Sequence, residues 1–138
     1  AICFIDLDGF KQVNDTLGHD AGDVLLRQAG QRMLECLRAS DTVARLGGDE
    51  FALILPGSHS LAELELVMGR IVESLAQTFV CNGHDVRIAG SIGVAIRRSE
   101  ATGIDELLRR ADLAMYLAKR AGGNAWRLYE QDKDLVEG

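Results

Sequence analysis

The chain has 138 residues, 47% hydrophobic and 26% charged, which is typical of one globular domain with a single core. Its net charge of −6, with no Lys/Arg cluster, argues against a nucleic-acid partner. No apolar run reaches the length of a membrane span, so we expect no membrane contact within this chain.

The first predicted element is a buried strand, residues 1–7, whose apolar run ends in acids. Asp6 and Asp8 stand at its carboxyl end, and residues 9–16 can form a short helix after it. The two carboxylates could bind a cation or could only cap that helix, and this segment alone favours neither interpretation.

A long helix is predicted next, from Asp20, which can cap it, to about Ala39. Its apolar face is expected to contain Leu26, Ala29, Met33 and Leu37. The cysteines lack metal-site spacing and fit core packing in a reducing, cytoplasmic setting. They are Cys3, Cys36 and Cys81.

A β-hairpin is predicted over residues 42–55, because two apolar runs flank Gly47-Gly48-Asp49-Glu50. The glycines leave room for a ligand to approach the backbone, and the acids project from the tip. Carboxylates held close together repel unless a cation or a shared proton relieves the repulsion. Together with Asp6, they indicate a hard-cation site. Oxygen-only ligation favours magnesium or manganese over zinc.

The second half of the chain continues the alternation of helices and strands. Ser60 and Glu63 form a capping-box pattern at the start of a helix, and Asn82-Gly83 indicates a hairpin turn before a long strand, residues 86–96. The helix after Ser60 should bury Leu61, Leu64, Met68, Ile71 and Leu75. A third long helix, ending at Gly122-Gly123, is marked by Ile104, Leu107, Ala111, Ala114 and Ala118.

The predicted order, with a short strand at 126–129, is β-α-α-β-β-α-β-β-α-β. It favours an α+β fold in which helices flank a central, mostly antiparallel sheet. We expect residues 1–129 to form the domain and the mostly charged residues 130–138 to be a tail or linker.

Four motifs, in order along nearly the whole chain, resemble the GGDEF family of diguanylate cyclases. Residues 6–15 with 18–23, 91–95 and 110–119 match the family in register with the hairpin motif. The hairpin motif itself is Gly47-Gly48-Asp49-Glu50-Phe51. The resemblance implies a fold related to the palm domain of nucleotide cyclases and polymerases, with the GGDEF residues on a β-hairpin.

The resemblance also implies a reaction, in which two GTP molecules condense into cyclic di-GMP and release two pyrophosphates. Each domain would hold one GTP, so a second GGDEF domain must face the first in a homodimer. Such phosphoryl transfer depends mostly on positioning and charge neutralisation, and two magnesium (or manganese) ions would contribute to both.

Catalytic and metal-binding roles follow from the same resemblance. Asp6 and Asp49 would ligate metal through their carboxylates, and the Leu7 carbonyl would add a ligand. Glu50 would either ligate metal or help to deprotonate the attacking hydroxyl, and both roles suit its charge.

The resemblance assigns further residues to GTP. Asn14 and Asp23 would read the guanine edge, although helix capping and surface solvation are the alternative for both. Backbone amides at a helix start suit phosphate oxygens, glycines admit the nucleotide, and lysines neutralise its charge. The residues assigned to GTP are Gly9, Phe10, Lys11, Asn14, Asp23, Gly47, Gly48 and Lys119.

One position departs from the family pattern. Many members carry Gly-Arg-Asn after the last helix, with the arginine on phosphate, whereas this chain has Gly122-Gly123-Asn124. Loss of a guanidinium fork predicts weaker triphosphate binding with catalysis retained. The family's Asp-x-Leu-Thr-Gly-Leu segment, which precedes the first strand, is also absent from this sequence.

A regulatory site is implied by Arg38 and Asp41, which match the family's RxxD inhibitory motif for cyclic di-GMP, with Arg70 as a secondary contact. The alternative is a surface salt bridge at a helix end.

A second function remains open beside the cyclase. In some family members this domain senses GTP or cyclic di-GMP and controls an attached domain, and parts of this sequence resemble domains fused to an EAL phosphodiesterase. The domain is expected in the cytoplasm, although the full-length parent could be anchored in a membrane.

Overall fold

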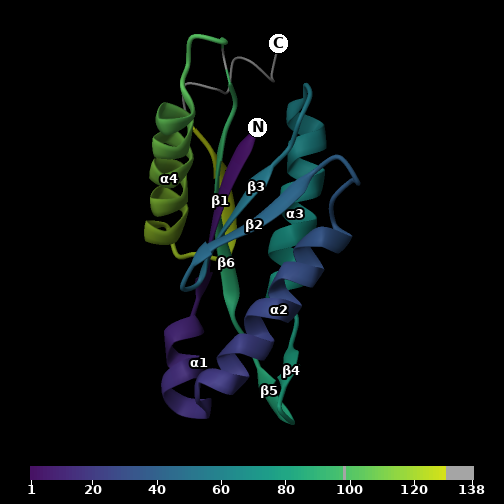
Figure 1. The fold of residues 1–138 in the computed structure, drawn as a ribbon, viewed down its shortest axis with the longest axis vertical. Helices are drawn as coiled ribbons and strands as arrows, with labels where there is room; N and C mark the ends of the chain where they lie inside the picture. The colour runs from purple at the N-terminus through teal and green to yellow at the C-terminus, as the bar shows by residue number, and fades with distance from the viewer. Residues whose placement is uncertain (98, 130–138) are drawn as a thin grey trace.

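A computed structural model describes residues 1–97 and 99–129, so the tail predicted at 130–138 lies outside the described residues. Its centre is a five-stranded sheet in the order β2-β3-β1-β6-β7 (Figure 1). The pairs are antiparallel except β6–β7, which is parallel. The strands are β1 (Ile2–Asp8), β2 (Thr42–Gly47), β3 (Glu50–Ile54), β6 (Ala89–Ala95) and β7 (Ala125–Leu128).

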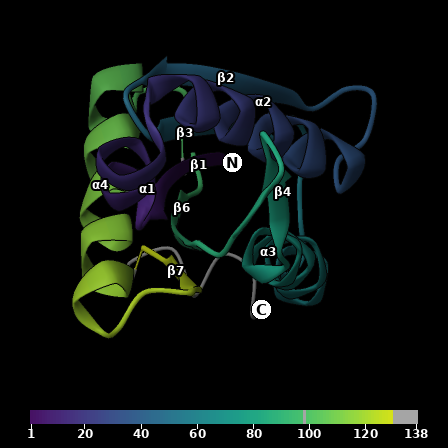
Figure 2. The ribbon, with the colours of Figure 1, turned by 90° about the horizontal axis from the view of Figure 1, so that it is seen from below.

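Helices cover both faces of this sheet (Figure 2). On one face, the larger core packs Ile5 and Leu7 of β1 against α2 and α3, and on the other Ile2 packs with α4. Because successive strand residues point to opposite faces, one strand contributes to both cores. The helices are α1 (Phe10–Leu17), α2 (His19–Glu35), α3 (Leu61–Ala76) and α4 (Ile104–Arg120). The predicted α+β architecture is therefore confirmed.

Helix α3 closely follows its sequence signals. Ser60 is the N-cap, and its hydroxyl oxygen accepts a hydrogen bond from the Glu63 amide at 3.2 Å. The Ser60 hydroxyl also lies 3.2 Å from the Glu63 carboxylate. Four of the five predicted side chains, Leu64, Met68, Ile71 and Leu75, are buried, and Leu61 in the first turn is only partly buried.

Helix α2 is shorter than predicted. It starts at His19 with Gly18 as its N-cap, so Asp20 lies in the first turn and makes no side-chain cap. It ends at Glu35, and Leu37 follows the helix as a partly buried residue. The Cys36 amide donates to the Met33 carbonyl at 3.0 Å, which tightens the last turn and ends the helix early.

The strand predicted at residues 86–96 is confirmed over residues 89–95, which form β6, but the strand is interrupted after Val86. Before this point the chain forms a separate two-stranded sheet, β4 (Phe79–Cys81) and β5 (His84–Val86), and it enters the central sheet only at β6. Asn82 and Gly83, with φ of 51° and 82°, form the predicted hairpin turn.

Arg32 of α2 gives the physical reason for this separation. Its guanidinium donates to the carbonyls of Ser74, Gln77 and Thr78 at 2.7–2.9 Å and stacks over the Phe79 ring at 3.5 Å. The small hairpin is thereby held on the helices rather than on the central sheet. Among the described residues, no helix is long and apolar enough to cross a lipid bilayer.

Candidate functional site

The carboxyl end of β1 and the tip of the β2–β3 hairpin lie side by side. Asp6 is opposite Glu50 in the antiparallel pairing of β1 with β3, and the Leu7 amide donates to the Asp49 carbonyl at 3.1 Å. Directly opposed residues of antiparallel strands share a face of the sheet. The fold thus brings together the predicted catalytic acids, although more than forty residues separate Asp6 from Asp49 in the sequence.

Lys119, in the last turn of α4, completes this acidic cluster. Its ammonium donates to Asp6 Oδ2 and lies 3.6 Å from Asp8 Oδ1. The hydrogen bond with Asp6, together with the charges of Asp8 and Asp49, raises the pKa of Lys119. Lys119 is therefore a fixed positive charge in the site.

The acids are more crowded than one lysine can balance. Burial, and then the neighbouring Asp6 carboxylate, raise the pKa of Asp49. Within residues 1–97 and 99–129, Asp6 Oδ1 and Asp8 Oδ1 are buried oxygens without a hydrogen-bond partner. Such oxygens are suited to accept a cation or a donor from a ligand.

The donor set fits magnesium better than a closed metal cage. In the described part of the chain, no three or more His, Cys, Asp or Glu side chains are arranged to hold a metal. Magnesium needs only one or two protein carboxylates, with water and substrate phosphates completing its shell. Asp6 and Asp49 supply such a pair.

The hairpin turn is open and braced. Gly47 and Gly48 have φ of 142° and 52°, and a Cβ built on either would meet no atom within 4 Å. Arg45 donates from Nε and Nη2 to the Gly48 carbonyl at 3.3 and 3.1 Å. The space over the turn is thus free for a ligand, while an arginine that sequence reasoning did not select holds the turn in shape.

The predicted guanine readers lie where α1 and α2 meet and along α2. The Asn14 amide packs against Gly22, and exposed Asp23 is the next residue of α2. Asp23 borders a pocket of about 550 Å³ between α2 and the β2–β3 hairpin. The lining residues are Asp23, Leu26, Arg27, Gly30, Leu34, Val43, Arg45 and Phe51, so of the two predicted guanine readers only Asp23 lines this pocket.

Three of the predicted phosphate contacts, Gly9, Phe10 and Lys11, lie at the start of α1. Gly9, at φ 93°, is the N-cap residue, and it brings the chain from β1 into the helix. The Phe10 side chain is buried in the core, so only its backbone is available there, while Lys11 is exposed on the first turn.

Gly123 has little room for a side chain. Its φ is 71°, and a Cβ built on it would lie 2.6 Å from Asp8 Oδ2 and 3.3 Å from Ser91 Oγ. Ser91 donates to Asp8 Oδ2 at 2.7 Å, so Asp8 is held between β6 and this turn. An arginine at position 123 would need a different backbone here. Both Asp8 and Ser91 stand in sequence motifs, but their contact with each other and with the Gly123 turn was not predicted.

The predicted regulatory residues line a second pocket of about 380 Å³. Its lining combines α3 with the segment after α2 and includes Arg38, Asp41 and Arg70. Asp41 Oδ2 accepts from the Arg38 amide at 2.8 Å and lies 4.0 Å from Arg38 Nε. The structure thus places all three predicted residues around one hollow.

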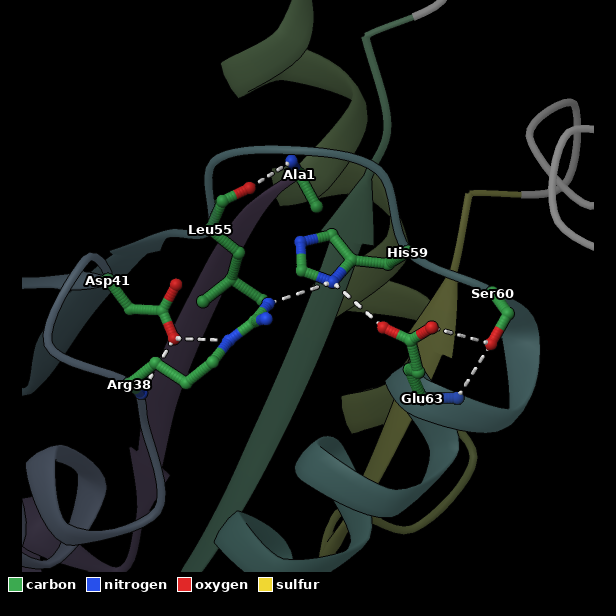
Figure 3. A network of polar contacts seen from close by, with 7 residues as sticks. All are labelled: Ala1, Arg38, Asp41, Leu55, His59, Ser60 and Glu63. Carbon is green, nitrogen blue, oxygen red and sulfur yellow. Dashed lines mark hydrogen bonds and ion pairs between the residues drawn. The ribbon is translucent and has the colours of Figure 1, made fainter.

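His59, which sequence reasoning missed, also lines this second pocket. Figure 3 shows Arg38 between Asp41 and His59, with Glu63 on the far side of the imidazole. Arg38 Nη2 is 3.5 Å from His59 Nδ1, which lies 3.8 Å from the Glu63 carboxylate. The His59 side chain is only 7% exposed, so it fixes the inner side of the arginine.

Comparison with known families and structures agrees with this geometry. The family model described as "Diguanylate cyclase, GGDEF domain" matches residues 1–125, and the chain therefore belongs to the GGDEF family. It is 42% identical over 130 residues to the bifunctional diguanylate cyclase/cyclic di-GMP phosphodiesterase MucR of Pseudomonas aeruginosa, covering 94% of this chain and 19% of MucR. It is 43% identical over 131 residues to the diguanylate cyclase TpbB of the same species, covering 94% of this chain and 30% of TpbB.

Solved structures show the same fold. The GGDEF domain of TpbB (YfiN) from Pseudomonas aeruginosa superposes with a TM-score of 0.87 at 41% identity, covering 93% of this chain and 80% of that one. The GGDEF domain of DgcB from Caulobacter crescentus, solved in complex with c-di-GMP, has a TM-score of 0.84 at 28% identity, with 94% and 77% covered. The chain spans less than a third of the length of the curated relatives MucR and TpbB.

Proposed function

We propose that this chain is a diguanylate cyclase domain, which joins two GTP molecules into cyclic di-GMP and releases two pyrophosphates. The observation that carries the proposal is the meeting of Asp6 with Asp49 and Glu50 beside an open glycine turn. Family membership and the relatives named as diguanylate cyclases support it.

The acids at the strand end would hold magnesium or manganese. Asp6 and Asp49 would bind it through carboxylates, with the Leu7 carbonyl as a further donor and Glu50 as a second ligand or a base. A bound divalent metal would offset the negative charge of the triphosphate and of the transition state. Lys119, already fixed beside Asp6, would add a positive charge next to the phosphates.

The remaining predicted contacts would orient the nucleotide. Asn14 and Asp23 would accept from the N–H groups of guanine, while Lys11 and the amides of Gly9 and Phe10 would face the phosphates. The open turn at Gly47 and Gly48 would admit the nucleotide beside the backbone. Their arrangement around one GTP would leave its 3′-hydroxyl free to react.

The reaction requires a second domain with its own GTP. The 3′-oxygen of one GTP forms a bond to the α-phosphorus of the other, the bond from that phosphorus to the bridging oxygen of its β-phosphate breaks, and pyrophosphate leaves. The hydroxyl proton passes to Glu50 or to water. Two such transfers close the ring, so the partner is a second GGDEF domain in a homodimer.

The test is to incubate the chain with GTP and magnesium and to separate the products by chromatography. We expect cyclic di-GMP from the wild type and at least a hundredfold less from Asp49→Ala and Glu50→Ala, as expected when charge stabilisation of the transition state is lost. Product formation by either variant at the wild-type rate would exclude these acids from catalysis.

We further propose that the pocket of Arg38, Asp41 and Arg70 binds the product and inhibits the enzyme. The guanidinium of Arg38 suits guanine O6 and N7 or phosphate, and Asp41 suits guanine N–H groups. Its support is the pocket geometry, together with the c-di-GMP complex of the related DgcB. Titration of cyclic di-GMP into Arg38→Ala should show at least tenfold weaker binding, and unchanged affinity would remove this site.

A second candidate, a module that senses GTP or cyclic di-GMP, is favoured by the crowding at Gly123. The turn packs on Asp8 where family members place a phosphate-binding arginine, so triphosphate contacts are fewer. GTP binding without cyclic di-GMP formation would establish this function instead. An attached domain such as an EAL phosphodiesterase would then be the regulated part.

The domain itself is proposed to extend from residue 1 to residue 129, with residues 130–138 as the tail or linker. We propose a cytoplasmic location, where GTP is available, for this domain of a longer parent protein. The relative MucR, whose name combines cyclase and phosphodiesterase activities, supports a parent with further domains.

A further inference from the structure

We propose that Gly22 is a positioning residue for guanine recognition, because its missing side chain creates the space in which the Asn14 amide sits against α2, at the residue before Asp23. This inference rests on the proposed GTP site and adds to it the residue that fixes one of its two guanine contacts.

The end of α1 and the start of α2 are joined around Gly18. The Gly18 amide donates to the Asn14 carbonyl at 2.9 Å, and the Gly22 amide donates to the Gly18 carbonyl at 3.2 Å. Gly18 is thus both the C-cap of α1 and the N-cap of α2, so the two helices join at this one residue.

Gly22 is fully enclosed at this junction. A Cβ built on it would lie 1.8 Å from Asn14 Oδ1 and 2.9 Å from Asn14 Cγ. Both distances are far below van der Waals contact, so any larger residue at position 22 must expel the Asn14 amide. Gly22 φ is not in the left-handed region, and glycine inside a helix is less favourable than alanine. The glycine is therefore explained by space rather than by backbone conformation or helix stability.

The amide group that a larger residue would displace carries a buried acceptor without a hydrogen-bond partner among the described residues. This acceptor is Asn14 Oδ1. The exposed Asp23 carboxylate, one residue beyond Gly22, borders the pocket of about 550 Å³. Two acceptors flanking one glycine suit the adjacent N–H donors of a guanine edge.

The experiment measures binding of 3′-deoxy-GTP with magnesium by calorimetry on the 138-residue chain, since this analogue lacks the attacking hydroxyl. We expect Gly22→Ala to weaken binding about tenfold, the effect of losing one hydrogen bond in a polar site. The matched control is Gly69→Ala within α3, where a Cβ meets nothing within 4 Å and affinity should not change.

A double-mutant cycle separates positioning from general disruption. If Gly22 acts through the amide, Asn14→Ala should weaken binding about tenfold, and Asn14→Ala with Gly22→Ala should bind like Asn14→Ala alone. Removal of the amide also relieves the steric conflict, so the double variant keeps the test valid where Gly22→Ala unfolds. Additive losses, or wild-type affinity of Gly22→Ala, would overturn the inference.

The same titration distinguishes this inference from the proposed function. Absence of 3′-deoxy-GTP binding by the wild type would contradict the proposed GTP site as a whole. If the wild type binds the analogue and Gly22→Ala binds it with the same affinity, only the proposed role of Gly22 would be wrong.

Discussion

At the scale of single residues, Gly93 shows how closely a strand can approach a helix. A Cβ at this position of β6 would lie 2.0 Å from the Ala111 carbonyl oxygen and 2.2 Å from the Met115 amide nitrogen of α4. Both contacts are with backbone, which cannot rotate away. The backbones of β6 and α4 can therefore approach each other this closely only because position 93 has no side chain.

We expect Gly93→Ala to destabilise the fold by about 3 kcal/mol or more, at the upper end of the cost of overpacking, because α4 must move away from the sheet. Chemical denaturation of both proteins measures this difference. The control Gly69→Ala should be neutral or slightly stabilising, because its Cβ meets no atom and alanine favours the helix. Equal stabilities of the two variants would refute the tight packing.

The buried thiol of Cys3 makes the stability of the fold depend on pH in the alkaline range. Burial raises the pKa of this thiol from 9.0 to about 12. Between these values the unfolded chain loses the thiol proton and the native chain keeps it, so the free energy of unfolding falls as pH rises. The contribution of the Cys3 thiol to the free energy of unfolding should fall by about 1.4 kcal/mol between pH 8 and pH 10.

The measurement compares urea denaturation of the wild type and Cys3→Ala at these two pH values. The variant lacks the thiol, so the stability difference between the two proteins should change by that amount. Stability differences that stay constant with pH would show that the Cys3 thiol does not titrate as its burial requires.

At the scale of elements, the N-cap residue Ser60 stabilises α3, a helix that lines the proposed product-binding pocket. It starts α3, and α3 carries Glu63 and Arg70 to the pocket around Arg38. Loss of an N-cap side chain typically costs about 1 kcal/mol and frays the first turn.

We therefore expect Ser60→Ala to lower the free energy of unfolding by about 1 kcal/mol, while Ser60→Asp, which retains a capping oxygen, should stay close to the wild type. Thermal or chemical unfolding of the three proteins is the check. A Ser60→Asp variant as unstable as Ser60→Ala would indicate that the hydroxyl acts through something other than the cap.

Helix α3 and the region of β5 and β6 show what a sequence can predict about elements. The apolar period and the cap of α3 are local signals, and both the start of the helix and its buried face agreed with the structure. The one strand predicted at 86–96 is divided between β5 and β6, because an apolar pattern does not show which strand each part pairs with. That was decided by Arg32 holding the small hairpin on α2 and α3, a contact between distant residues.

The residues of the candidate site also fall into those that the sequence predicted and those that it did not. Asp6, Asp49 and Glu50 stand in contiguous motifs, so the sequence predicted them and the strand pairing brought them together. The contacts of Ser91 with Asp8 and of His59 with Arg38 were not predicted, because the partners are 83 and 21 residues apart and a motif does not show which distant residue its members contact. Residues that position a site are therefore harder to predict than residues that carry its charge.

At the scale of the whole molecule, the chain supplies one half of the proposed reaction. One cluster of acids and one adjacent pocket suit one GTP, whereas the product contains two guanylate units. In the proposed reaction both transfers require two loaded domains facing each other, so the proposed active species is a pair, and the fraction of chains in pairs should control the rate.

We expect the rate per chain to rise with protein concentration, in proportion to it while most chains are single, and to level off once most are paired. Product formation measured over a hundredfold range of concentration, with sedimentation at the same concentrations, tests this expectation. As the control, fusion to a parallel dimeric coiled coil should raise the rate at low concentration and remove its dependence on concentration, because the partner is then held nearby. A rate per chain that stays constant while sedimentation shows single chains would mean that one domain completes the reaction alone, and the half-site account would be wrong.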